Sequence, residues 1–371
     1  MSKYFKLDVK NKKITESLND FLSRLLEHKV VDVLLIPQRL AKSTVQTVIE
    51  DREKIKDADP LAPVIPVNSS IIAANLTRTT LNKKVGIILK PCEIRAFLEL
   101  VKLNQAHLDN VVIISGDCFG TYTVSDYQEF LKVTDSKRAS GDSFLQMVQS
   151  KGKVVPLRTA CQICEYPTPQ NAHISILTCG VDSVKEILLE VEDTLAEKLS
   201  PLSLKSASLP KKREAALLKI QKEKKKEREK VFKEIEKDVS KIENFISLFS
   251  TCIGCQNCRK VCPICYCEVC LFETNVLKYE SAKYFRWAKK KGILRMPTDT
   301  LLFHITRMNH MITSCVECGS CESACPSKIP IGTIFSFLAG KAQHVFDYKP
   351  GIDVKDELPL ATFKEEELEP R

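Results

Sequence analysis

Two short runs of cysteines carry the most specific chemical signal in this sequence. Each run has the spacing C-x2-C-x2-C-x3-C followed by a proline, and the second begins about fifty residues after the first ends. Three thiolates two residues apart can hold three corners of one 4Fe-4S cluster, while the fourth binds a neighbouring cluster. The two runs therefore predict two 4Fe-4S clusters, with the ligands Cys252, Cys255, Cys258, Cys262, Cys315, Cys318, Cys321 and Cys325.

The same spacing predicts how the two runs share their ligands. Cluster one takes the first three cysteines of the first run and Cys325, and cluster two takes the first three of the second run and Cys262. Zinc ribbons are the alternative, but their ligands come as two C-x2-4-C pairs without a third cysteine at the same step. The spacing favours iron–sulfur over zinc.

The remaining cysteines give weaker signals. Cys161 and Cys164 form an isolated C-x2-C, which is compatible with zinc, a redox dithiol or a cluster. Three more thiols follow the first run, and they make a fourth cluster possible only if a further ligand joins them, because such a cluster takes four. These surplus thiols, whose role the sequence leaves open together with that of Cys179, are Cys265, Cys267 and Cys270.

Size and composition restrict the class of protein. A chain of 371 residues with 44% hydrophobic residues has room for two or three domains with ordinary cores. Its first residues lack an apolar signal region, and no apolar run approaches the length of a membrane span, so we expect neither secretion nor membrane insertion. Sixteen cysteines then indicate metal ligands rather than disulfides, because the cytoplasm keeps thiols reduced. We expect that cytoplasm to be anaerobic, because clusters of this type are often sensitive to oxygen.

The net charge of +9 is concentrated in one stretch. Residues 211–230 contain ten basic and four acidic residues, which is +6 of the total. The rest of the chain is nearly balanced, so a nucleic-acid-binding surface is not expected. The lysine-rich stretch is predicted to be a solvated helix face. The alternative, which assigns it a specific function, is that it docks on an acidic partner.

The elements that position these cysteines alternate between strand and helix patterns, which predicts an α/β domain. A buried strand at 30–37 is expected to end at Pro37, and a second strand at 85–89 runs through Lys90 and Pro91 into a helix. This strand–turn–helix with a lysine at the turn is either an anion site or an ordinary βα unit. Other expected elements are helices at 14–29, 42–54, 71–80, 121–150 and 182–199, strands at 110–120 and 173–178, and an extended segment at 62–67.

A long helix and a second domain follow. The pattern predicts one helix over 211–246, with an apolar seam at Phe232, Ile235, Val239, Ile242 and Ile246. Two helices are expected between the cysteine runs. The predicted fold is thus an α/β domain joined to an α+β, ferredoxin-like domain for two 4Fe-4S clusters. The expected division is 1–200 for the α/β flavin and cluster domain, 201–246 for the linker and basic helix, 247–335 for the ferredoxin-like domain with its helical insertion, and 336–371 for a C-terminal tail.

Several of these motifs together resemble a known family. They are, in chain order, KPCEIRAFLELVKLNQ, GDCFGTY, CQICEYPTPQNAHIS, CIGCQNCRKVCPICYCEVC and CVECGSCESACP. The sequence resembles the beta subunits of hydrogenases that reduce the deazaflavin coenzyme F-420 (F420) and of related formate dehydrogenases, and it is closer to the formate dehydrogenase type. The resemblance covers roughly residues 80–340.

The resemblance implies cofactors and partners. In that family the subunit binds FAD and relays electrons between a catalytic dehydrogenase or hydrogenase subunit and a soluble carrier. It implies a third 4Fe-4S cluster on Cys92, Cys118, Cys161 and Cys164, and it makes Lys90, Pro91 and Arg95 our candidates for flavin contacts. The carrier stays open among coenzyme F-420, NAD(P) and ferredoxin.

We therefore expect an iron–sulfur flavoprotein subunit of an oxidoreductase complex. Clusters move single electrons and hydride carriers exchange two, so a flavin is needed between them. The alternatives are a flavin-free, polyferredoxin-like electron carrier and a nucleic-acid-binding protein with structural clusters. No residue is predicted to act as a general acid or a nucleophile.

Overall fold

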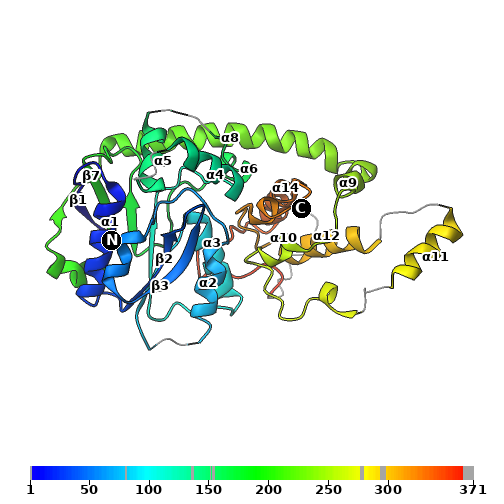
Figure 1. Ribbon diagram of the computed structural model, residues 1–371, viewed down its shortest axis with the longest axis horizontal. Helices are drawn as coiled ribbons and strands as arrows, with labels where there is room; N and C mark the ends of the chain where they lie inside the picture. Colours follow the sequence, from blue (N-terminus) through cyan, green and yellow to red (C-terminus); the bar gives the residue numbers. More distant parts are fainter. Residues whose placement is uncertain are drawn as a thin grey trace.

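The computed structural model describes the chain except for residues 1, 80–81, 135–137, 151, 153–154, 276–279, 293–297 and 362–371. A sheet flanked by helices forms one end of the molecule, a group of helices forms the other, and the long helix α8 runs along both (Figure 1). Within the described residues, no helix combines the length and the apolar character that crossing a membrane requires.

The α/β domain is built on one eight-stranded sheet with the order β3-β2-β4-β5-β6-β7-β1-β8. Strands β2, β4, β5 and β6 run parallel, and the strands on either side of them pair antiparallel. The strands are β1 Ser2–Asp8, β2 Val33–Arg39, β3 Thr44–Ile49, β4 Val85–Ile88, β5 Val111–Gly116, β6 Ile174–Leu177, β7 Glu186–Glu192 and β8 Lys205–Ser206.

Both faces of this sheet are covered, as buried parallel strands require. Successive residues of β2 enter different cores: Leu34 and Ile36 pack on one face, and Val33 and Leu35 on the other.

The α-helices are α1 Ile14–Glu27, α2 Ser69–Leu76, α3 Pro91–Lys102, α4 Val124–Val133, α5 Ser140–Gln149, α6 Thr159–Gln162, α7 Asp193–Ala196, α8 Lys211–Val239, α9 Ile242–Leu248, α10 Asn257–Lys260, α11 Ser281–Lys291, α12 Thr298–Met311, α13 Ser320–Ser323 and α14 Ile331–Val345, with 3-10 turns η1 Arg52–Asp57, η2 Glu197–Leu202 and η3 Leu271–Glu273.

Three local predictions in this domain are wrong. The segment predicted as a helix over 42–54 is strand β3 followed by η1, and much of the helix predicted over 182–199 is strand β7. Both strands pair antiparallel outside the parallel centre, where alternating β-branched and polar residues suit a half-buried strand. Pro37 does not end β2, because β2 continues to Arg39 along β3 after its pairing with β4 has stopped at Leu35.

The predicted strand–turn–helix at Lys90 is confirmed. Pro91 is the first residue of α3, and the Glu93 carboxylate accepts a hydrogen bond of 2.9 Å from the Lys90 backbone N–H. Its other oxygen accepts one of 2.7 Å from the backbone N–H of Ser69, at the start of α2. One buried carboxylate thus fixes the N-termini of two helices beside the turn.

The long helix is shorter than predicted, and one side of it contacts the rest of the chain. It ends at Val239, and α9 begins at Ile242, whose side chain is exposed. Only the first part of the predicted seam is covered: Ile235 is buried, and Phe232 packs edge-on against Phe337 of α14, with ring centroids 5.4 Å apart. Helix α8 therefore packs against the C-terminal domain.

The start of α8 is anchored in the α/β domain by a buried ion pair. Arg213 donates two hydrogen bonds, of 2.5 and 2.7 Å, to the carboxylate of Asp117 at the end of β5. The same carboxylate accepts the backbone N–H groups of Thr178 and Cys179, each at 2.8 Å. Most residues of the lysine-rich stretch are exposed, as the predicted solvated face requires, but Arg213 is buried.

The C-terminal segment is also more ordered than the predicted tail over 336–371. Helix α14 continues to Val345, and the chain then returns to α3. There the Tyr348 hydroxyl donates to Glu99 at 2.6 Å, and the Gly351 N–H donates to the same carboxylate oxygen at 2.7 Å. This return ties the end of the described chain to the helix that carries Cys92.

We expect the Asp117–Arg213 pair to be far costlier to break than the exposed ion pairs. Replacing Arg213 by Met would leave a buried carboxylate without its charge partner, which costs about 3–5 kcal/mol. Urea unfolding followed by far-UV circular dichroism measures the loss. Lys205→Met, which removes a lysine from an exposed pair with Asp8, is the matched control and should change stability little. Equal effects of the two substitutions would contradict the assignment.

Candidate functional site

The two cysteine runs fold into loops of the same shape. In the first, Gly254 and Gln256 flank the middle cysteine with positive φ angles of 69° and 57°. In the second, Glu317 and Gly319 occupy the equivalent places with 59° and 68°. A short helix, α10 or α13, follows each loop at the same distance. The repeated left-handed turns give both loops the same curvature around their thiols.

The last cysteine of the second loop lies with the first three of the first loop. Burial raises the pKa of the Cys258 thiol, and three neighbouring thiols raise it further. These neighbours are Cys252, Cys255 and Cys325. The four thiols are called set one. Cys255 is exposed, so set one lies near the surface of the protein.

The complementary four thiols surround a hollow of about 420 Å³. They are called set two and are Cys262, Cys315, Cys318 and Cys321. Burial raises the pKa of Cys262 to about 12. The sulfur of Met311, on α12, lies 3.6 Å from the Cys262 sulfur, so apolar side chains close the hollow from that side. The grouping of thiols into sets one and two is the one that the spacing predicts.

Four thiols of the α/β domain surround another hollow, of about 380 Å³. They are called set three and are Cys92, Cys118, Cys161 and Cys164. Cys92 lies in the first turn of α3, Cys118 follows β5, and Cys161 is in α6. The structure thus brings together the four cysteines that the family resemblance implies.

Sets two and three are adjacent. Cys318 lines both hollows. Next to it, Gly319 approaches α6 so closely that an added Cβ atom would lie 2.3 Å from the Cβ of Ala160. A glycine is needed there both for its positive φ angle and for this contact. The three sets therefore form a row, with set two between set one and set three.

Helix α8 supports the junction of the two domains. The Lys224 ammonium donates to the carbonyl oxygen of Cys161 at 2.9 Å and lines the hollow of set three. Arg228 makes two hydrogen bonds to Glu317, of 2.5 and 2.7 Å, and lies 3.3 Å from a carboxylate oxygen of Glu165. Basic residues of the predicted docking helix thus contact both the second loop and the segment that carries set three.

The donor sets fit clusters better than single ions. In the part of the chain that the structure describes, no three His, Cys, Asp or Glu side chains meet closely enough to hold one metal ion. Sets two and three enclose hollows instead, and four thiolates around a hollow are the donor set of a 4Fe-4S cluster. Burial raises the pKa of Cys315, so metal binding there must displace a proton.

Three basic side chains near these sets were not predicted as site residues. Arg158 donates to the Cys161 sulfur at 3.5 Å, and Arg307 donates to the carbonyl oxygen of Cys258 at 3.0 Å. The His304 Nε2 atom lies 3.3 Å from the sulfur of Cys252, and burial lowers the histidine pKa to about 4. Only Arg158, three residues before a cysteine, has a local sequence signal.

The surplus cysteines have different environments. Burial raises the pKa of Cys265, which the guanidinium of Arg307 partly offsets. Cys267 is exposed and Cys270 is half-buried. Cys179 is buried beside the Asp117–Arg213 pair, far along the chain from all three. These positions assign no fourth set of four thiols among the described residues.

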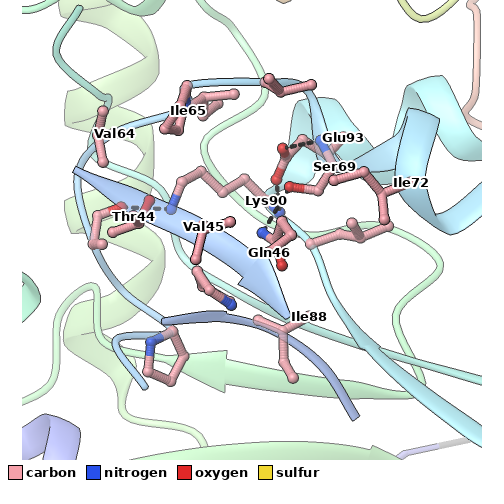
Figure 2. Close-up of a pocket in the computed structure, with 16 residues that line it drawn as sticks. Thr44, Val45, Gln46, Val64, Ile65, Ser69, Ile72, Ile88, Lys90 and Glu93 are labelled. Atoms are coloured by element: carbon pink, nitrogen blue, oxygen red, sulfur yellow. Dashed lines mark hydrogen bonds between the residues drawn. The ribbon is translucent and has the colours of Figure 1, made fainter. Parts of the chain in front are cut away.

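The candidate flavin contacts separate in the structure. Lys90 lines a hollow between β3, α2 and the loop before it (Figure 2). Its ammonium donates to the Ala62 carbonyl at 2.8 Å. Pro91 lines the hollow of set three instead. Arg95 faces the C-terminal segment, where it donates to the Pro350 carbonyl at 2.9 Å and lies 3.9 Å above the ring of Tyr166. The three candidates therefore do not line one common hollow, and Lys90 is the one that lines the apolar hollow beside β3.

The Lys90 hollow has the lining of a ring-binding pocket. Apolar side chains such as Val64, Ile65 and Ile72 surround it, and Gln46 reaches in from β3 (Figure 2). The Gln46 amide nitrogen donates to Ser69 at 2.8 Å, while its buried oxygen has no partner among the described residues. Apolar walls with a few fixed polar groups are typical of cofactor sites. The residues present fit a flavin.

A second hollow adjoins the other side of Lys90. It lies at the carboxyl ends of β4 and β5 and contains Cys118 of set three. The buried hydroxyl of Ser115 lines it and has no hydrogen-bond partner in the described part of the chain. Ligands of open α/β sheets bind at the carboxyl ends of strands. Lys90 thus stands between the apolar pocket beside β3 and the hollow that contains Cys118 of set three.

Comparison with known proteins gives a domain family and several relatives. Residues 248–329 match the model of the 4Fe-4S dicluster domain. The F420-dependent formate dehydrogenase beta subunit of Methanocaldococcus jannaschii is 27% identical, with 89% of each chain covered. The beta subunit of F420-dependent formate dehydrogenase 1 of Methanococcus maripaludis is 28% identical, with 75% of each chain covered. A chain of the F420-reducing [NiFe] hydrogenase complex of Methanosarcina barkeri matches 66% of this chain and 94% of its own with 13% identity and a TM-score of 0.45.

The dicluster domain and these relatives define an iron–sulfur oxidoreductase subunit. More narrowly, the chain resembles the beta subunits of F420-dependent formate dehydrogenases over most of its length. The resemblance inferred from the cysteine motifs and the KPCEIRA turn is thereby confirmed.

The shared ligation of the two loops gives a sharp prediction. Cys325→Ser should disturb the cluster of the first loop, although Cys325 belongs to the second loop, and Cys321→Ser should disturb the other cluster. Low-temperature EPR of the reduced proteins distinguishes them, because the two substitutions should alter different signals. If both altered the same signal, each loop would hold its own cluster and the assignment of sets one and two would be wrong.

Proposed function

We propose that this chain relays electrons between a partner catalytic subunit and a soluble carrier through three 4Fe-4S clusters and FAD. The observation that carries the proposal is the row of thiol sets, in which Cys318 lines the hollows of both set two and set three. Set one would receive electrons at the surface, where Cys255 is exposed. Set three adjoins Lys90, beside which the flavin would bind.

The cofactors have complementary tasks. When bound, the clusters pass electrons singly, and FAD collects two of them for a carrier that accepts a pair. The protein supplies position and environment. The loops hold the thiols, α6 and α8 close the joint between the domains, and Lys90 offers a positive charge to the flavin.

The partner and the carrier follow from the relatives. Because those proteins are named as beta subunits of F420-dependent formate dehydrogenases, we place formate oxidation on a partner catalytic subunit and make coenzyme F-420 the first candidate carrier. NAD(P) and ferredoxin stay as alternative carriers. All sixteen cysteines are free of disulfides, which supports the reducing cytoplasm as the location.

The two alternative functions have less support. In the nucleic-acid reading, the basic residues of α8 would face a phosphate backbone, but Arg213, Lys224 and Arg228 bond within the protein. The flavin-free electron carrier gives no role to the apolar pocket at Lys90 or to the unpartnered oxygen of Gln46. Both observations favour the flavoprotein relay.

An anaerobic visible spectrum of the full chain, with assay of acid-extracted flavin, tests the proposal. The relay predicts flavin bands above broad cluster absorption and about one FAD per chain. Cluster absorption without flavin would favour the polyferredoxin-like carrier. A protein with neither, purified without oxygen, would refute the proposed function.

Lys90 gives a residue-level prediction for the flavin site. Lys90→Met keeps the length of the side chain but removes its charge and its hydrogen bond to Ala62. We expect at least a tenfold weaker affinity for FAD, measured by fluorescence titration of deflavinated protein, because a charge-assisted hydrogen bond contributes about 1.5–3 kcal/mol. Lys83→Met, on an exposed lysine paired with Glu50, is the control. Unchanged affinity in Lys90→Met would place the flavin elsewhere.

A further inference from the structure

Two buried arginines lie in the row of thiol sets without a carboxylate partner. Arg307 and Arg158 are 3% and 5% exposed. Within the described residues, neither guanidinium has an acidic side chain at ion-pair distance, and in each the Nε and Nη1 atoms are buried without a hydrogen-bond acceptor. A buried charge without a partner is strongly unfavourable, so such groups ordinarily face an opposite charge. These two residues are called the junction arginines.

Arg307 lies between sets one and two. It lines the hollow of set two, and its Nη2 atom donates to the carbonyl of Cys258, a member of set one, at 3.0 Å. The rings of Phe303 and Phe335, with centroids 5.6 and 5.1 Å away, shield it from water. Its two unpartnered nitrogens are therefore enclosed beside the space that the thiols of set two surround.

Arg158 lies between sets two and three. It precedes α6, lines the hollow of set three, and donates from Nη2 to the Cys161 sulfur at 3.5 Å. That hollow also contains Cys318 of set two. Arg158 thus repeats at the second junction the position that Arg307 has at the first.

Other buried arginines of the chain show what is unusual here. Arg213 has the carboxylate of Asp117, and Arg259 has that of Glu273. Arg95 uses Nε and Nη1 on two backbone carbonyls. The junction arginines alone, among the buried arginines that the structure describes, have two unsatisfied nitrogens and no carboxylate.

We propose that Arg307 and Arg158 are positioning residues that set the potentials of the clusters on either side of them, Arg307 for sets one and two and Arg158 for sets two and three. This inference rests on the proposed function. A cluster held by four thiolates is negatively charged and becomes more negative when it accepts an electron. The unpartnered nitrogens of each arginine can donate hydrogen bonds to the cluster, and the guanidinium places a fixed positive charge beside it. The hydrogen bonds and the charge both stabilise the more negative, reduced form of the cluster.

The arrangement has a consequence for the middle cluster. Set two faces both arginines, whereas sets one and three each face one. The reduced form should therefore be stabilised most at the middle of the row. An electron would be drawn inward from set one and held at the joint between the domains, next to set three.

EPR-monitored redox titration of the full chain with its clusters tests this. Arg307→Met should lower the midpoint potentials of clusters one and two and leave cluster three unchanged. Arg158→Met should lower those of clusters two and three and leave cluster one unchanged. The expected change is at least tenfold in the ratio of reduced to oxidised cluster at a fixed solution potential, or about 59 mV for one electron. Signals are assigned with cysteine-to-serine variants of each set.

Matched variants separate charge from packing. Arg307→Lys and Arg158→Lys keep the positive charge, so their cluster potentials should return most of the way from the Met-variant values to those of the unchanged protein. Arg286→Gln removes a charge from the exposed face of α11 and should change no cluster potential. If a Met variant loses iron, the corresponding Lys variant must retain it, because the charge is what the cluster requires. Iron loss in both, unchanged potentials, or equal shifts in all three clusters would overturn the inference. Wild-type chain that holds no clusters would instead refute the proposed function.

Discussion

The structure depends on one requirement, that four thiols meet around each hollow although no single segment supplies all four. Set two takes Cys262 from a loop other than that of its remaining members, and set three draws on α3, the end of β5 and α6. Metal binding to such sets is folding energy shared between distant segments. The domains are therefore joined by their cofactor sites as well as by α8 and by the return of the C-terminal segment to α3.

The second requirement is charge balance in a region that excludes water. Thiolates near the domain joint need positive partners, and the chain places Lys224 and the junction arginines there. Elsewhere in the same region carboxylates are matched with arginines, as in Arg228 with Glu317. The difference between matched and unmatched arginines follows the position of the thiol sets. This is the pattern expected if negatively charged clusters, and not carboxylates, balance the positive charge of the junction arginines.

Local spacing was enough to predict much of the site. The repeated C-x2-C-x2-C-x3-C-P predicts the grouping of thiols in sets one and two. The turn at Lys90 was predicted because a strand pattern ends there and a helix pattern begins. Strands β3 and β7 were mistaken for helices, because a short strand has little periodic signal. Arg307 could not be found, because its role depends on contacts between α12 and a loop far away in sequence. The internal contacts of α8 could not be found either, because the net charge of a stretch does not reveal that one of its basic residues has a buried partner such as Asp117.

The central claim is that three sets of thiols hold three clusters in one row, and the iron content of the anaerobic chain tests it most directly. The account predicts about twelve iron atoms per chain, four for each of three clusters, and about eight in Cys92→Ser, with the EPR signals of clusters one and two retained. About eight iron atoms in the wild-type chain, unchanged by Cys92→Ser, would contradict it, because set three would then hold no cluster and the row would end at the dicluster domain.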